Sequence, residues 1–174
     1  MIKRFAAIVF PLTLLLLAGP ALGQICKYDS IVATAPASRF TDNGDGTVTD
    51  KATGLQWKRC SEGQTWSGGT CIGSPTTRTW QQALQLAEAA SYAGKSDWRL
   101  PNVKELSSIV ELACYKPAID AAIFPATPAS WYWSSSPSAG YPLRAWGVDF
   151  DDGNDGYGSK DGVNGRVRLV RGGQ

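Results

Sequence analysis

Apolar residues recur at helical spacing in residues 79–91, TWQQALQLAEAAS. The apolar stripe consists of Trp80, Ala83, Leu84 and Ala87. Thr79 stands where a capping side chain is needed, and Gln82 follows three residues later as its reciprocal partner. The pattern predicts a helix that packs one face on a core and is closed by Gly94.

Residues 100–112, LPNVKELSSIVEL, repeat this pattern. Asn102 is placed as the cap, and Glu105 follows as its partner. The apolar stripe consists of Val103, Leu106, Ile109 and Val110. We expect a second core-packing helix, and because capping is a sufficient reason for Glu105, we interpret this residue as structural rather than catalytic.

Alternating apolar and polar residues predict antiparallel strands elsewhere. Phe40 and Val48 flank the turn residues 43–46, NGDG, which predicts a hairpin, and residues 131–137, WYWSSSP, predict an aromatic strand. The later strands place Trp146, Val148 and Phe150 opposite Gly147, Asp149 and Asp151, and Val167 and Leu169 opposite Arg166 and Arg168. Two helices packed on short antiparallel strands, with a loop-rich C-terminal half, make an α+β domain.

The first residues have the composition of a secretory signal peptide. Lys3 and Arg4 precede an apolar run, and small residues lead up to Gly23. A retained membrane anchor is the alternative, but the run contains Pro11 and lacks a basic flank behind it. We therefore expect a signal peptide at residues 1–23, one domain at 24–174 without a membrane span, and a periplasmic, secreted or cell-surface location.

Charge gives no reason to expect nucleic acid or anionic lipid as a partner. Removing Lys3 and Arg4 with the signal peptide leaves 15 basic residues against 15 acidic ones, so the mature chain is formally neutral. A neutral chain has no bulk attraction to polyanions.

Four cysteines remain after cleavage, and an even number in an exported chain predicts two disulfides. Cys60 and Cys71 bracket a Gly-rich loop that would be floppy unless its ends were joined, which favours a Cys60–Cys71 bond. Cys26 and Cys114 then pair by remainder. A zinc site is the rival interpretation, but the chain has no CxxC pair and no His.

Five segments together resemble the Lcl C-terminal domain family. They are NGDGTVTDKATGLQW (43–57), DWRLPNVKEL (97–106), YWSSSP (132–137), AWGVDF (145–150) and VRLVRGG (167–173). The resemblance implies a C-type-lectin-like fold. The WRLP segment is also similar to the formylglycine-generating-enzyme branch of that fold, but that reaction needs late cysteines and none follows Cys114.

The same fold includes the variable proteins of diversity-generating retroelements, in which exposed codons of a C-terminal surface are rewritten. The likeness implies that variation would fall on residues 138–144 and on outward positions from Gly147 to Arg166; at Arg166 the chain departs from the aromatic residue that is common there. Small polar residues with occasional Tyr are typical of adaptable binding surfaces, although a set of solvated turns has a similar composition. The expected ligand-binding residues are Tyr141, Arg144, Gly147, Asp149, Asp151, Asn154, Asp155, Tyr157, Ser159, Asp161, Asn164 and Arg166.

Catalysis is poorly supported, because a chain without His lacks the usual base or metal ligand. Asp149, Asp151 and Asp152 could form a carboxylate pair, but adjacent acids in a Gly-rich loop are more often solvated. Calcium is the alternative that the dense oxygen ligands keep open, yet the sugar-binding triplets of C-type lectins are missing, so we expect no metal or cofactor. Most Trp residues are expected in the core, and Trp66 is expected to be exposed.

We therefore expect a non-enzymatic, adhesin-like module that binds an extracellular or surface protein or glycan through its C-terminal loops. A receptor diversified by a retroelement is one form of this hypothesis. The alternatives are an envelope-associated structural domain without a specific ligand and, less favoured, an enzyme of the formylglycine-generating type.

Overall fold

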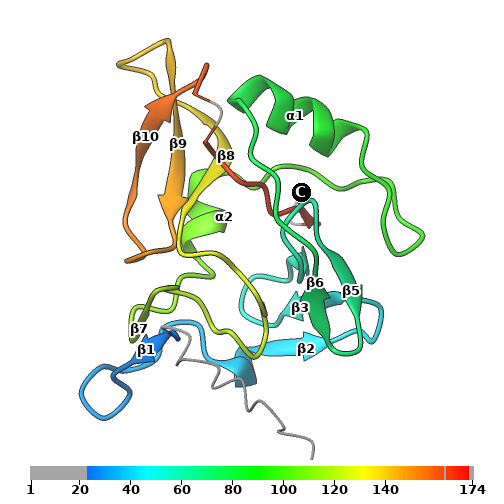
Figure 1. The fold of residues 1–174 in the computed structure, drawn as a ribbon, viewed down its shortest axis with the longest axis vertical. Helices are drawn as coiled ribbons and strands as arrows, with labels where there is room; N and C mark the ends of the chain where they lie inside the picture. Colours follow the sequence, from blue (N-terminus) through cyan, green and yellow to red (C-terminus); the bar gives the residue numbers. More distant parts are fainter. Residues whose placement is uncertain (1–22, 163, 173–174) are drawn as a thin grey trace, which may run out of the picture.

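Small antiparallel sheets and two helices make up the described part of the chain, residues 23–162 and 164–172, in the computed structural model (Figure 1). One sheet has the strand order β11–β4–β3–β2, with β2 at Phe40–Asp42, β3 at Thr47–Asp50, β4 at Gln56–Lys58 and β11 at Val170–Arg171. A second sheet has the order β10–β9–β8, with β8 at Trp131–Pro137, β9 at Arg144–Asp149 and β10 at Asp155–Ser159. The predicted signal peptide lies outside the described residues except for Gly23.

Two short ribbons and three helical segments complete the structure. The ribbons pair β1 (Ile25–Cys26) with β7 (Cys114–Tyr115), and β5 (Thr65–Ser67) with β6 (Thr70–Ile72). The helices are α1 (Trp80–Glu88) and α2 (Val103–Ser107), and a 3₁₀ turn covers Ala37–Arg39. The α+β prediction is confirmed in this coarse form, although strands dominate over the helices.

Both predicted capping boxes are present. The Thr79 hydroxyl accepts a hydrogen bond from the Gln82 backbone at 3.3 Å, and the Gln82 side chain accepts one from the Thr79 backbone at 3.1 Å. Asn102 and Glu105 exchange the same two bonds at 2.9 and 2.8 Å. The starts of both helices were therefore readable from local sequence.

The ends of the helices differ from the prediction. Helix α1 stops at Glu88, and Gly94 adopts its left-handed φ of 69° in the following turn rather than at the helix end. Helix α2 has five residues, so Ile109 and Val110 are buried from the irregular segment that follows it. The apolar residues at these two positions are therefore explained by burial of their side chains in the core and not by a longer helix.

Both predicted disulfides, Cys60–Cys71 and Cys26–Cys114, are formed. The first ties the ends of the segment that carries the β5–β6 ribbon. The second joins β1 to β7, where Cys26 and Cys114 are also register partners. The start of the described chain is thus fixed to a segment 88 residues away.

The core has two clusters on opposite sides of β8, because successive side chains of a strand point to opposite faces. Tyr132 belongs to the cluster that contains Val48, Trp57, Leu106, Ile109, Phe124, Val148 and Phe150. Trp133 belongs to the cluster that contains Ala83, Ala87, Trp98, Leu100, Ala145, Val167 and Leu169. Strand β8 therefore joins the helices to both sheets.

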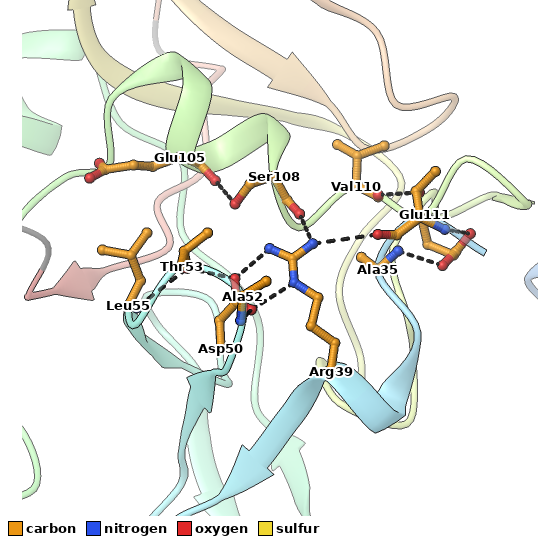
Figure 2. A network of polar contacts seen from close by, with 11 residues as sticks. Ala35, Arg39, Asp50, Ala52, Thr53, Leu55, Glu105, Ser108, Val110 and Glu111 are labelled. Carbon is orange, nitrogen blue, oxygen red and sulfur yellow. Dashed lines mark hydrogen bonds and ion pairs between the residues drawn. The ribbon is translucent and has the colours of Figure 1, made fainter. Parts of the chain in front are cut away.

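A buried ion pair connects the β2–β3 hairpin to helix α2 (Figure 2). The Arg39 guanidinium donates to both oxygens of Asp50, through Nε at 2.6 Å and through Nη2, and also to the Ser108 carbonyl at 2.9 Å. Asp50 is fully buried. Burial alone would raise the pKa of the Asp50 carboxyl, but hydrogen bonds from Arg39, Thr53 and the Ala52 backbone outweigh it and hold the pKa below its usual value.

The alternating pattern placed Arg166 and Arg168 on the face opposite Val167 and Leu169, and the burial of Arg168 corrects the expectation that this face meets solvent. The Arg168 side chain is completely buried, although it lies between Val167 and Leu169. The guanidinium donates to the carbonyls of Lys58 and Arg59 and to the Thr127 hydroxyl, and it lies 4.8 Å from the centre of the Phe124 ring. Burial lowers the pKa of this guanidinium from its usual value. Here both faces of the segment are covered.

Two indole rings of β8 cover the glycines of the neighbouring strands. A Cβ atom added to Gly158 would lie 2.9 Å from the Trp133 ring, and one added to Gly165 would overlap that ring. A Cβ at Gly147 would lie 2.5 Å from the Trp131 ring. The two indoles contact each other edge to face, with centroids 5.7 Å apart. The glycines of this region are therefore required for packing, because any side chain would displace an indole.

Gly165→Ala is expected to lower the free energy of unfolding by about 2–3 kcal/mol, because the new methyl group must displace the buried Trp133 ring. Gly140→Ala is the matched control, since the space around Gly140 is open and the change should stay within about 0.5 kcal/mol. Denaturant unfolding followed by Trp fluorescence measures both. Equal stability of the two variants would contradict the packing role.

Asp50→Asn is expected to lower the free energy of unfolding at neutral pH by about 3 kcal/mol, because Arg39 loses its buried partner. Since the folded pKa of Asp50 lies below the unfolded value, its contribution is present above about pH 4 and is lost as the pH falls through the folded pKa. The variant should therefore lose less stability than the parent on acidification. Asp97→Asn, which removes an exposed partner of Arg171, is the control and should leave the acid limb of the stability curve almost unchanged.

Candidate functional site

The hairpin of β9 and β10 carries most of the predicted ligand-binding residues. Its register pairs Arg144 with Ser159, Trp146 with Tyr157, and Val148 with Asp155. Paired residues share one face of a sheet, so these side chains lie together. On this face Val148 is buried in the core, whereas its partner Asp155 and the residues Arg144, Tyr157 and Ser159 are exposed.

Three aromatic rings gather at the open end. Tyr141, from the loop between β8 and β9, lies against Tyr157 with centroids 5.1 Å apart and the ring planes 33° apart. Trp146 meets Tyr157 edge to face at 5.3 Å. Tyr141 remains 52% exposed and Tyr157 37% exposed. We call Tyr141, Arg144, Trp146 and Tyr157 the Tyr–Arg cluster.

Arg144 places a cation on the faces of both tyrosines. Its guanidinium carbon lies 5.3 Å from the Tyr141 centroid and 5.1 Å from the Tyr157 centroid. Within the described residues, the ion pairs and side-chain hydrogen bonds do not include Arg144. The rings thus orient a planar cation whose N–H donors are free to meet a carboxylate, a sulfate or a carbonyl group.

A pocket of about 240 Å³ adjoins the cluster, between helix α1 and the loop before β9. Lys160 lies in its wall, where Nζ is 4.4 Å from the centre of the Trp80 ring and donates to the Pro142 carbonyl at 2.8 Å. Leu143, which is 75% exposed, and Asp161 also line this pocket. The open surface therefore combines aromatic, apolar and cationic groups.

The predicted residues Asp149, Asp151 and Asn154 form the turn at the other end of the hairpin. Asp149 accepts a hydrogen bond from the Asp151 backbone at 3.0 Å, and Asp152 accepts from the Asn154 backbone at 3.1 Å. The Asp151 carbonyl accepts a bond from the Lys116 backbone at 2.8 Å. Within residues 23–162 and 164–172, His, Cys, Asp and Glu side chains form no group of three or more that could hold a metal ion.

The prediction for Gly147 as a ligand contact is wrong. Gly147 is buried beneath the Trp131 indole, so it offers no surface to a ligand. The alternating pattern placed it correctly on the face opposite Trp146 but could not show that Trp131 covers that face.

Arg166 is also separated from the cluster. Its backbone pairs with β8 through bonds to the Trp131 carbonyl at 2.9 Å and from the Trp133 amide at 3.0 Å, and its side chain donates to the Ser130 hydroxyl. Arg166 therefore lies across β8 from β9. The other predicted residues Asp155, Ser159, Asp161 and Asn164 are exposed on β10 or in the loop that follows it.

The sequence analysis did not include Trp146, Leu143 and Lys160 among the candidate residues, although they lie in or beside the Tyr–Arg cluster. Trp146 was expected in the core, but on its face of the hairpin only Val148 is buried. Leu143 follows Pro142 in a turn, and an apolar residue in such a turn was an available signal. No periodic pattern marked Lys160.

Two other candidates have structural roles. Trp66, expected to be an exposed aromatic, is half-buried, and the Arg59 guanidinium lies 4.1 Å from the centre of its ring. Glu105 lines a pocket of about 550 Å³, but both of its oxygens accept from Arg99 at 2.7 Å. Burial alone would raise the pKa of Glu105, and the bonds from Arg99 and Asn102 hold it below its usual value. The Glu105 carboxylate therefore serves as a helix cap and an ion-pair partner of Arg99.

Residues 46–171 match the family model of the Lcl C-terminal domain. The match runs from the turn before β3 to β11 and includes the whole β8–β9–β10 sheet. The search of curated proteins gave no match. Of the helices in the described part of the chain, none has the length and apolar character needed to cross a membrane.

Proposed function

The chain belongs to the Lcl C-terminal domain family, and from this premise we propose that it is an exported, non-enzymatic module that binds a protein or glycan through its C-terminal surface. The Tyr–Arg cluster is the observation that carries the proposal. Exposed aromatic rings with an oriented, unpaired cation cost solvation and add little to the core, so a ligand is the simplest reason for them.

The cluster has the properties of a binding surface. Tyr141 and Tyr157 offer large contact area and lose little side-chain entropy on binding. Arg144 can donate two parallel hydrogen bonds to one planar acceptor. The hairpin that carries them is held from behind by Trp131 and Trp133, which supports a preorganised site.

Catalysis has no part in the proposal. The chain contains no His, and the buried or half-buried carboxylates of Asp50, Glu105 and Glu111 are occupied by structural hydrogen bonds. Two disulfides support an oxidising compartment, in keeping with export to the periplasm, the medium or the cell surface.

A C-type-lectin-like fold and a history of diversification are the finer parts of the proposal. Short helices beside a loop-rich sheet are compatible with that fold. On β10, fixed and free positions alternate: Gly156 and Gly158 face the indoles, while Asp155, Tyr157 and Ser159 face solvent. Such an arrangement lets outward residues change while the packing is kept.

Arg144→Ala and Tyr157→Ala are each expected to weaken the Kd for the ligand at least about tenfold, because each removes a central contact of the surface. A screen of glycans, sulfated polymers and surface proteins identifies the ligand, and titration of the purified mature chain gives the Kd. A chelator should leave the Kd unchanged, since the proposed contacts use no metal.

Lys51→Ala is the matched control, because it removes an exposed cation from the turn after β3. An unchanged Kd in both cluster variants would show that the ligand binds at another part of the surface. A wild-type chain that binds nothing in the screen would favour the structural, envelope-associated alternative.

Related gene copies are expected to differ at the codons of exposed residues and to keep those of the glycines beneath the indoles. The variable codons are those of Tyr141, Arg144, Asn154, Asp155, Tyr157, Ser159, Asp161 and Asn164; the constant ones are those of Gly147, Gly158 and Gly165. Sequencing of the copies tests this. Differences spread evenly along the gene would contradict diversification.

A further inference from the structure

The outer edge of β10 has no partner strand within the described residues. Strand β10 ends the order β10–β9–β8, and it is the outermost strand of that sheet in Figure 1. The isolated bridges between other segments of the described chain do not involve it either. A row of backbone donors and acceptors is therefore available along this edge.

The register shows which backbone groups these are. Hydrogen bonds join Asp149 to Asn154 and Lys160 to Leu143, both at 2.9 Å. Because alternate pairs of an antiparallel ladder are hydrogen-bonded, the peptide groups of Gly156 and Gly158 face β9. Those of Asp155, Tyr157 and Ser159 consequently face away from the sheet. Of these groups, the Ser159 carbonyl already accepts a hydrogen bond from the Gly162 backbone at 3.0 Å, which leaves its second lone pair for a partner strand.

Pro, Lys and a β-bulge, three common protections of a free edge, are missing from β10, and Asp155 is its one charged residue. Its sequence, DGYGS, contains no Pro and no Lys, and its pairing with β9 runs through all five residues without a bulge. Such an edge is a template for another strand.

We infer that the outer edge of β10 pairs, antiparallel, with the same edge of a second copy of this chain. A two-fold axis at Tyr157 places this residue opposite Tyr157 of the second copy and Ser159 opposite Asp155 of the second copy. Both are positions whose peptide groups face outward, so the hydrogen bonds of the new ladder match.

Charge makes this register self-complementary. Arg144 lies beside Ser159 on the shared face and has no carboxylate partner among the described residues. In the pair, Asp155 of the second copy comes opposite Ser159, two strands or about 10 Å from the Arg144 backbone on the same face, which the long Arg144 side chain can span. Each copy supplies the acid that the other lacks, and the symmetry produces the contact twice.

The pairing makes one six-stranded sheet with two Tyr–Arg clusters on the same face. A ligand with repeated units could then contact both clusters, which would increase avidity without new contacts. The inference itself rests on the strand edge and its charges, and it stands or falls without any ligand.

Cysteine cross-linking of the mature chain tests the register. Tyr157→Cys is expected to give a disulfide-linked dimer under mild oxidation, because a hydrogen-bonded pair has Cα atoms about 5.5 Å apart. Ser159→Cys is the matched control: its two copies would lie roughly 13 Å apart along the strands and should not link. Linking of both variants at the same rate would overturn the inference.

Sedimentation equilibrium tests the charges without removing the tyrosine. Asp155→Arg is expected to weaken self-association at least about tenfold, and adding Arg144→Asp should restore it by exchanging the two charges. A wild-type chain that stays monomeric at its highest soluble concentration overturns the inference. So does self-association that Asp155→Arg leaves unchanged, because the contact would then lie elsewhere.

Discussion

The contact between the two indoles of β8 and the glycines around them is the constraint on which the rest of the molecule depends. Trp131 and Trp133 lie where side chains at Gly147, Gly158 and Gly165 would otherwise stand. Each indole therefore packs directly against the backbone of a neighbouring segment. On the opposite side of the same hairpin, the side chains near Arg144 do not pack in the core. Aromatic and charged side chains there remain exposed to water.

Local sequence predicted the local parts of the structure well. The capping boxes at Thr79 and Asn102 depend on residues three positions apart, and both are present. The NGDG turn, the aromatic strand and the Cys60–Cys71 disulfide also follow from spacing and composition over short distances. The Cys26–Cys114 disulfide, which joins residues 88 positions apart, followed by elimination. The helix ends were predicted less well, because the burial of Ile109 and Val110 continues after the helix stops and tertiary packing decides where it stops.

The parts that sequence did not predict are non-local. Alternation correctly assigned Trp146 and Val148 to one face of β9, but it could not show that the core covers only Val148 on that face. Arg168 has an outward position in the pattern, yet the carbonyls of Lys58 and Arg59 and the Thr127 hydroxyl enclose it, more than 40 positions away along the chain. For the same reason Gly147 was taken for surface. The sequence pattern thus placed most of the candidate residues on the β9–β10 hairpin. Which of them lie close together could be read only from their contacts in the structure.

The position of the β1–β7 ribbon determines which part of the molecule faces away from a tether at the start of the described chain. Figure 1 shows this ribbon at the opposite end of the molecule from the Ser159 end of β10. The Cys26–Cys114 bond joins the two strands of the ribbon covalently, so a pulling force applied at Ile25 reaches the segment at Cys114 without separating β1 from β7. Tethered there, the molecule would present the Ser159 end of β10 on the side away from the attachment point.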